Sequence, residues 1–391
     1  MKKMTFISLM LIFLMTTLSA GGNGEDPAPQ TTSQQSPYSG LFTRGEFSTD
    51  YSRYIDFDGE IMSGGVGKDG IPAIDNPRFN SVSEAREFLS EKEPVLAITL
   101  QEQTKIYPLR ILMWHEIVND TVADTPVAVT YCPLCNTGIA FNRQVKGRTL
   151  TFGTTGRLRY SNLVMYDRQT ETWWQQASGR ALIGEFAGTE LTLIPVLTVS
   201  WDDAAESYPD AQVLSRETEY NRPYGQNPYV GYDDPSATPF LYRGPASPDQ
   251  HRPLERVLTV KIEDSTKVYS YAVLEQQRVI NDEIAGKPVT VFWGEGTASA
   301  LDTPAIQTGR DIGSANAFKP RADGQTLTFM PDESGSITDT QTGSRWNILG
   351  EAVSGPLEGT ALEPLSGIQH FWFSAYAFSP EGTLFSGEGT E

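Results

Sequence analysis

The sequence predicts a β-rich α+β protein made of two tandem, related domains. Each domain is expected to be a strand-dominated sheet or barrel with one or two short helices. Glycine (35 residues) and proline (25) are abundant among the 391 residues, which favours many turns and short strands over long helices. Hydrophobic residues make up 39% of the chain, enough for substantial cores. The chain is also longer than one ordinary domain and contains an internal repeat.

Residues 1–20 have the pattern of a signal peptide: a basic start, an apolar run and small residues suited to cleavage. The apolar run is shorter than the roughly twenty residues that a membrane helix needs. Residues 21–45 begin with a stretch rich in Gly, Pro, Ser, Thr and Gln, and we expect a disordered tether there. We therefore expect a periplasmic or extracellular protein with no stable membrane insertion after cleavage; an uncleaved anchor is the alternative.

The folded part is expected to begin at residue 46, and its first elements can be predicted in order. Ser81-Val-Ser-Glu84 has the spacing of a capping box, which starts a short helix. Residues 95–100 and 105–109 have the pattern of a β-hairpin, and residues 110–119 that of a helix. Strand-like pieces separated by glycine turns then continue to about residue 213.

Residues 126–135 are the most informative stretch of the chain. Val127, Val129 and Tyr131 alternate along it, which predicts a half-buried strand. The strand runs into Cys132-Pro-Leu-Cys135, which contains the only two cysteines of the protein. If the protein performs chemistry, we expect it here.

The chain repeats itself. Residues 93–131 align without gaps on residues 255–293, with 13 of 39 positions identical. Further identities follow in the same order, such as Gly147-x-Thr-Leu-Thr-Phe152 with Gly324-x-Thr-Leu-Thr-Phe329. The predicted organisation is a first copy at 46–215, a Pro- and Tyr-rich connector at 216–254 and a second, degenerate copy at 255–391.

Residues found in only one copy are better candidates for function than residues found in both. His115 aligns with Gln277, and Cys132 aligns with Gly294, so the second copy lacks the reactive side chains. We expect the second copy to cover the first or to complete its cleft.

Other polar residues carry weaker signals. Glu116, Asp120 and Asp167 could serve as acid or base groups near the cysteines, but the two aspartates recur in the second copy, which favours a structural role. His251 and His370 have no clustered partners in the sequence, and we interpret both as structural or exposed.

Several motifs resemble the domain-of-unknown-function 3179 family (DUF3179). They are Asp69-Gly-Ile-Pro-Ala-Ile-Asp-Asn-Pro77, Trp114-His-Glu-Ile-Val-Asn-Asp120, Thr130-Tyr-Cys-Pro-Leu-Cys-Asn-Thr137, Met165-Tyr-Asp-Arg168 and Asn227-Pro-Tyr-Val-Gly-Tyr232. The resemblance spans nearly all of the exported part. It implies a shared fold unit and shared signature residues, and it implies no particular activity.

A metal site is the first hypothesis for the cysteines. Cys132, Cys135 and His115 would supply two thiolates and an imidazole, a set that suits copper or zinc. Three ligands leave one position open for substrate, water or a partner's ligand, and Met165 is a possible soft fourth ligand. The sequence thus predicts an exported copper- or zinc-binding protein; whether it is an enzyme stays open.

Two alternatives remain. A Cys-x-x-Cys pair can act as a thiol–disulfide oxidoreductase, with Cys132 as nucleophile and Cys135 as resolving thiol. The turn-forming residues after Cys135 do not show the helix that usually supports such a pair. The third hypothesis is a ligand- or protein-binding scaffold with a structural disulfide, although so short a loop stabilises little. A metal-donor or thiol partner protein would fit the first two hypotheses.

Composition and motifs exclude other classes. A net charge of -19 disfavours nucleic acid and anionic membranes as partners. The sequence shows no dinucleotide fingerprint, phosphate loop, serine nucleophile elbow or zinc-protease His-Glu-x-x-His motif. We therefore expect no nucleotide cofactor.

Overall fold

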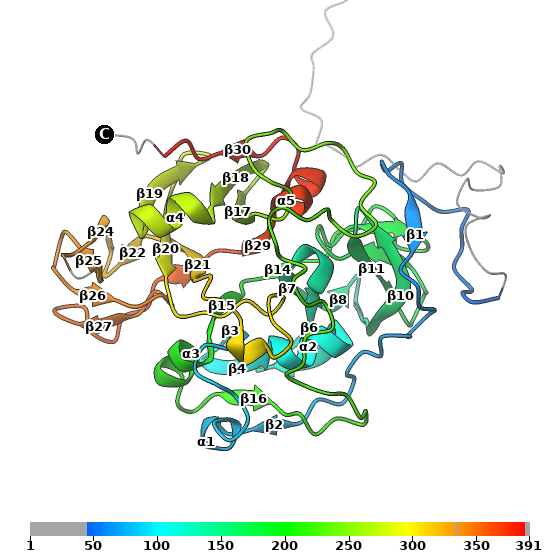
Figure 1. Ribbon diagram of the computed structural model, residues 1–391, viewed down its shortest axis with the longest axis horizontal. Coiled ribbons are helices and arrows are strands. Elements are labelled where there is room, and N and C mark those ends of the chain that lie inside the picture. The colour runs from blue at the N-terminus through cyan, green and yellow to red at the C-terminus, as the bar shows by residue number, and fades with distance from the viewer. Residues whose placement is uncertain (1–44, 334, 388–391) are drawn as a thin grey trace, which may run out of the picture.

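The computed structural model describes residues 45–333 and 335–387. The predicted signal peptide and all but the last residue of the predicted tether lie outside these ranges. The described chain is β-rich, with several sheets and short helices, as the sequence predicted (Figure 1). Within these ranges, no helix combines the length and the apolar character needed to cross a membrane.

The first half contains three sheets and a small hairpin. Sheet A has the order β15 (Leu197–Ser200), β3 (Pro94–Leu100), β4 (Gln103–Pro108), β16 (Gln212–Leu214) and β2 (Phe79–Asn80). Sheet B has the order β14 (Leu193–Ile194), β7 (Thr137–Asn142), β6 (Thr125–Cys132) and β5 (Ile117–Val122). Sheet C has the order β1 (Ile61–Ser63), β10 (Phe152–Arg159), β11 (Asn162–Asp167), β12 (Trp173–Gln175) and β13 (Ala181–Ile183). The hairpin consists of β8 (Gln144–Val145) and β9 (Arg148–Thr149).

The helices of the first half are α1 (Val82–Ala85), α2 (Leu109–His115) and α3 (Trp201–Ser207). The capping box at the start of α1 and the β3–β4 hairpin are confirmed. The predicted helix over residues 110–119 is wrong at its end. Glu116 adopts a left-handed conformation with φ 57° and ends α2, and the next residues pair with β6 as strand β5.

The second half contains sheets with corresponding strand orders. Sheet A′ has the order β29 (Gly367–Phe371), β17 (Arg256–Ile262), β18 (Ser265–Ser270) and β30 (Thr383–Leu384). Sheet B′ has the order β19 (Val279–Ile284), β20 (Lys287–Gly294), β21 (Ser314–Lys319) and β28 (Glu363–Pro364). Sheet C′ has the order β24 (Phe329–Pro331), β25 (Ile337–Asp339), β26 (Arg345–Trp346) and β27 (Ala352–Ser354). The remaining elements are the hairpin β22 (Arg321–Ala322) and β23 (Gln325–Thr326), helices α4 (Tyr271–Gln277) and α5 (Trp372–Phe378), and the 3₁₀ turn η2 (Ile306–Thr308).

A buried ion cluster holds the hairpin of sheet A to sheet B. Lys105 Nζ lies 3.0 Å from the Asp120 carboxylate, and the Tyr107 hydroxyl donates to the same carboxylate at 2.7 Å. The same contacts recur in the second half among Lys267, Tyr269 and Asp282. Asp120 and Asp282 thus each tie a strand to a hairpin, and the contacts of Asp120 are compatible with the structural role predicted for it.

The two halves pack closely on one another. Strand β29 lies beside β7, and β15 lies beside β21. The Asn316 amide joins the halves, because it accepts from Thr198 N–H and donates to Thr198 O, both at 3.2 Å. One hydrophobic core includes Val95 and Val199 from the first half and Phe292 and Phe318 from the second. This core therefore crosses the boundary between the predicted copies.

Strand β6 lies at the centre of the largest core. Every residue from Val127 to Cys132 is buried, because α2 packs against the strand and other members of the core cover it. The prediction of a half-buried strand is therefore wrong.

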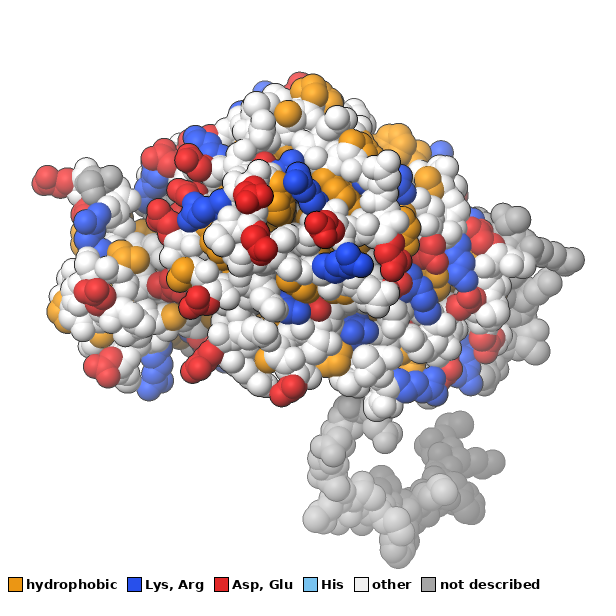
Figure 2. Space-filling view, turned by 90° about the horizontal axis from the view of Figure 1, so that it is seen from below, with side chains coloured by type: hydrophobic (Ala, Val, Ile, Leu, Met, Phe, Trp, Pro, Cys, Tyr) orange, Lys and Arg blue, Asp and Glu red, His pale blue; other side chains and the backbone are white. Residues whose placement is uncertain are grey.

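The surface carries charges of both signs. On the face shown in Figure 2, acidic and basic side chains are interspersed, with no broad basic area.

Candidate dithiol site

The two cysteines lie on the turn between β6 and β7. Cys132 ends β6, and Pro133 opens the 3₁₀ turn η1 (Pro133–Cys135), where its ring presets the backbone. Asn136 ends η1 in a left-handed conformation (φ 51°), and its N–H donates to Pro133 O. The Pro-Leu pair thus closes a tight turn that presents both cysteines at one end of sheet B.

Both cysteines are free thiols, and both are buried. The two thiols donate to one acceptor, the carbonyl oxygen of Ser161, at 3.8 Å from Cys132 and 3.3 Å from Cys135. They also interact with each other. A structural disulfide therefore finds no support here, whereas a closely spaced dithiol does.

The shared acceptor belongs to a strained turn. Tyr160 and Ser161 connect β10 to β11 as a two-residue hairpin loop, and both have positive φ angles, 52° and 63°. Glycine, asparagine or aspartate normally occupies such positions. Strain of this kind persists only where the surroundings hold it, and it is frequent at functional sites. Residues 157–162, which the sequence indicates could line a cleft, include Ser161, but the sequence did not identify Ser161 as the acceptor of the two thiols.

Burial raises the pKa of the Cys132 thiol well above its ordinary value, and the neighbouring Cys135 thiol adds to the rise. The thiolate is the nucleophile and the metal ligand in cysteine chemistry. The enclosed site therefore favours the protonated form of the Cys132 thiol.

Part of the connector covers the dithiol. The Tyr232 hydroxyl donates to Leu134 O and accepts from the N–H of Phe240, both at 3.0 Å. The Ser161 hydroxyl donates to Phe240 O at 2.5 Å. The cysteine turn and the hairpin loop that supplies its acceptor are therefore both tied to the connector.

Glu116 lies beside Cys132. Its carbonyl accepts from the N–H of Tyr131 at 2.8 Å, which brings the end of α2 against the end of β6. Burial raises the pKa of the Glu116 carboxyl well above its ordinary value, and Cys132 adds to the rise. Tyr229 of the connector interacts with both groups. The site thus combines two thiols with one buried acid.

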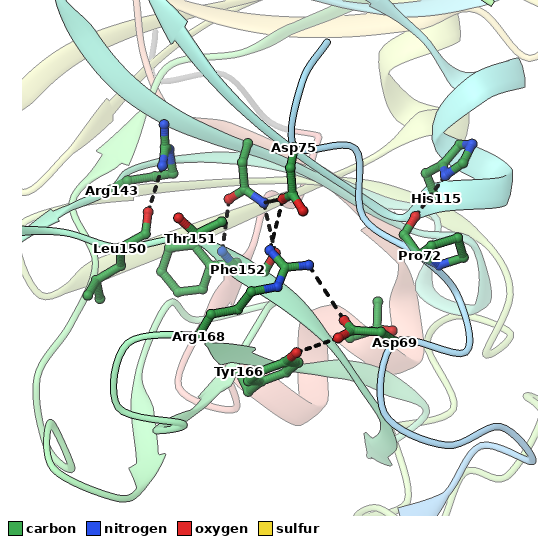
Figure 3. Close-up of polar contacts among 12 residues, drawn as sticks. Asp69, Pro72, Asp75, His115, Arg143, Leu150, Thr151, Phe152, Tyr166 and Arg168 are labelled. Carbon is green, nitrogen blue, oxygen red and sulfur yellow. Dashed lines mark hydrogen bonds and ion pairs between the residues drawn. The ribbon is translucent and has the colours of Figure 1, made fainter. Parts of the chain in front are cut away.

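Both ring nitrogens of His115 form hydrogen bonds with groups other than the thiols. Its Nδ1 donates to Pro72 O at 2.7 Å, because a carbonyl can only accept (Figure 3). Its Nε2 then accepts from the Tyr224 hydroxyl at 2.5 Å. Burial lowers the pKa of the His115 ring, which therefore stays neutral near pH 7. His115 joins the segment before α1 to the connector.

The segment that supplies Pro72 is itself anchored to sheets B and C. Arg168 lies between Asp69 and Asp75 in Figure 3 and forms an ion pair of 2.8 Å with Asp75. Tyr166 donates a hydrogen bond to Asp69, and Asn119 donates to Asp75 at 2.8 Å. Through these contacts, residues of Met165-Tyr-Asp-Arg168 hold the segment of residues 69–77 in place, which is a structural role for both motifs.

The predicted metal ligands are only partly brought together. Cys132 and Cys135 are adjacent, whereas both His115 nitrogens face other partners. Across residues 45–333 and 335–387, no group of three or more His, Cys, Asp or Glu side chains is arranged to hold a metal ion. Met165 is packed in the same hydrophobic core as the cysteines.

The remaining histidines lie elsewhere. His251 contacts the Glu255 carboxylate at 2.8 Å. His370 is buried on β29 with its Nε2 2.7 Å from the Thr259 hydroxyl, and burial lowers its pKa to about 3. Both contacts are compatible with the structural roles predicted for these residues.

Comparison with known proteins gives one match. A family model described as "Protein of unknown function (DUF3179)" matches residues 68–382. The matched range includes the dithiol turn, the connector and most of the second half. No curated protein and no solved structure matches the chain.

Proposed function

The chain belongs to the DUF3179 family, whose function is unknown, and we propose from its site that the protein is a thiol–disulfide oxidoreductase acting through Cys132 and Cys135. The observation that carries this proposal is the pair of free thiols held on one acceptor, Ser161 O. Two adjacent thiols can form a bridge with little movement of the chain. The buried Glu116 carboxyl interacts with Cys132 in the same site.

The proposed reaction transfers two electrons to a substrate disulfide. The Cys132 thiolate attacks one substrate sulfur, and the other substrate sulfur leaves as a thiolate. The Cys135 thiolate then attacks the Cys132 sulfur of the mixed disulfide and releases the second substrate thiolate. The protein loses two electrons and two protons and keeps a Cys132–Cys135 disulfide; the substrate becomes a dithiol. A partner dithiol must reduce the bridge before the next turnover.

The test is a redox titration of the full-length protein. Samples are equilibrated in mixtures of reduced and oxidised dithiothreitol, and free thiols are alkylated and counted by mass. We expect one two-electron transition, and we expect Cys135→Ser to accumulate a mixed disulfide on Cys132 when a disulfide peptide is added. A pair that stays fully reduced at every ratio, with no mixed disulfide in the variant, would contradict the proposal.

Metal binding is the second candidate. Its support is the same pair of adjacent sulfurs, because soft thiolate ligands select Cu(I) and also bind zinc. Binding through His115 as well would require Nε2 to leave the Tyr224 hydroxyl. Copper and zinc contents of purified protein, compared with those of Cys132→Ser, test this candidate. Metal near one equivalent that disappears in the variant would favour it over the redox function.

We also propose that the two halves arose by duplication and that the protein works after export. Matching strand orders support the duplication, as does a repeated bond from a tryptophan indole to an aspartate. The indole bond joins Trp174 to Asp167 and Trp346 to Asp339, each at 3.0 Å. Export rests on the N-terminal sequence alone. Determination of the mature N-terminus in the producing cell tests it.

A further inference from the structure

The stretch between β16 and β17 is a long irregular segment that crosses the front of the molecule in Figure 1. Residues 215–255 are all described, and apart from one isolated bridge between Gln226 and Ala305 they form no helix or strand. Irregular loops of this length inside compact domains are uncommon and are often active-site covers.

The inner side of this segment touches the dithiol turn through few polar contacts. The Tyr232 hydroxyl and the backbone of Phe240 supply the three hydrogen bonds to Leu134, to Ser161 and between themselves. The apolar side chains of Val230 and Phe240 are 55% and 49% exposed. Hydrophobic burial therefore contributes little at these two positions, whereas Tyr229, Tyr232, Ala237 and Tyr242 pack against the core that contains the cysteines.

Residues of the second half hold the segment through Asp233. Asp233 follows Tyr232, and its side chain is completely buried. Its carboxylate accepts from Arg256 at 2.6 Å and from the Ser299 hydroxyl, and it pairs with Arg310 at 2.9 Å. Removal of Asp233 is expected to be costly, because it would leave the Arg256 guanidinium, only 9% exposed, without its counter-charge.

Two of the residues that contact Asp233 come from the segment of the second half that corresponds to the cysteine turn. In the first half, β6 and β7 are joined by Pro133–Cys135 and Asn136. In the second half, β20 and β21 are joined by residues 295–313, which carry Ser299 and Arg310. The backbone of the same loop also accepts from Asn227 N–H at 2.9 Å and from Gly231 N–H at 2.7 Å. The half without cysteines thus uses this position to hold the connector over the cysteines of the other half.

We infer that residues 227–242 are a lid that must lift before the thiols can react, and that Asp233, Arg256, Arg310 and Ser299 are its latch. The biological purpose of the lid rests on the proposed function, whereas the labelling experiment that tests the lid does not. Residues on the other side of the lid mark a fixed end: Tyr224 is bound to His115, and the Trp114 indole donates to Gln226 O at 3.2 Å. The lid therefore opens on the side of the latch.

The test measures how fast the thiols of the full-length protein react with iodoacetamide, at several urea concentrations below the unfolding transition. Asp233→Asn removes the charge that the two arginines share. Tyr232→Phe removes only the hydroxyl that bridges Leu134 and Phe240, and its ring keeps its packing. Asp234→Asn is the matched control, because this neighbouring exposed carboxylate accepts its hydrogen bonds from Ser236 rather than from Arg256, Arg310 or Ser299.

We expect labelling at least tenfold faster in Asp233→Asn, several-fold faster in Tyr232→Phe and unchanged in Asp234→Asn. In the two lid variants the rate should depend weakly on urea, because local opening exposes little surface. Should Asp233→Asn fail to fold, Tyr232→Phe carries the test. Rates equal to wild type in both lid variants, or a urea dependence as steep as that of global unfolding, would overturn the lid. The redox titration is independent: faster labelling without disulfide exchange would reject the oxidoreductase and keep the lid.

Discussion

Glu116 and Arg278 occupy the same backbone position in the two halves of the protein. Each ends a helix with a positive φ, 57° and 63°, and each donates its N–H to the carbonyl four residues earlier at 2.7 Å. Glu116 lies beside Cys132, whereas the guanidinium of Arg278 lies over the ring of Trp293. The same corner of the fold therefore carries a buried acid only where it meets a thiol.

Glu116→Gln is expected to remove a pH-dependent loss of stability. The folded protein raises the pKa of Glu116 well above its ordinary 4.5, so above pH 4.5 the folded carboxyl keeps a proton that the unfolded chain releases. The free energy of unfolding should then fall as pH rises, until the folded pKa is passed, by up to about 1.4 kcal/mol per pH unit. Urea unfolding between about pH 5 and pH 8 measures this slope; Arg278→Gln is the control. An unchanged slope in Glu116→Gln would show that the carboxyl is not protonated in the fold.

His370→Gln should have the opposite pH signature. Burial lowers the pKa of His370 to about 3 from 6.5, so below pH 6.5 the unfolded chain takes up a proton that the folded chain does not. Wild-type stability should therefore fall as pH drops from 6.5 towards 3, by up to about 1.4 kcal/mol per unit. The variant should lose less stability over this range. Parallel acid unfolding curves for the two proteins would refute the assignment.

His115→Gln tests whether this residue is an anchor of the connector or a metal ligand. As an anchor, it satisfies the Tyr224 hydroxyl and Pro72 O, and disturbing a buried hydrogen-bonded group costs about 1–3 kcal/mol. We expect a lower unfolding midpoint and a metal content equal to wild type. Loss of copper or zinc matching that of Cys132→Ser would instead restore the three-ligand site.

Asp120→Asn and Asp282→Asn compare the same ion cluster in the two halves. Removal of one partner from a buried pair costs about 3–5 kcal/mol because the other charge stays buried. Lys105 is 9% exposed, whereas Lys267 is 23% exposed and can reach water. Asp120→Asn should therefore destabilise the protein more than Asp282→Asn, as judged from urea midpoints at constant slope. The reverse order would contradict this explanation.

Local chemistry was enough to predict some elements. The capping box at Ser81 and the β3–β4 hairpin depend on contacts within a few residues, and both are confirmed. The end of α2 was missed because Glu116 takes a left-handed conformation, and the residues after it pair with β6. The alternation along β6 suggested that only the face with Val127, Val129 and Tyr131 is buried. Packing from both sides also buries the opposite face, which carries Ala128, Thr130 and Cys132.

The sequence by itself determined a β-rich chain, the recurrence of one pattern in two halves, and a single cysteine pair on a proline turn. Periodicity and turn chemistry act over a few residues, so these features can be read from neighbours along the chain. Only the tertiary structure decided what surrounds the thiols. Ser161 O and Tyr232 reach the site from elsewhere in the chain, and His115 bonds to Tyr224. Burial and hydrogen bonding of a thiol depend on such distant partners, which no local pattern specifies.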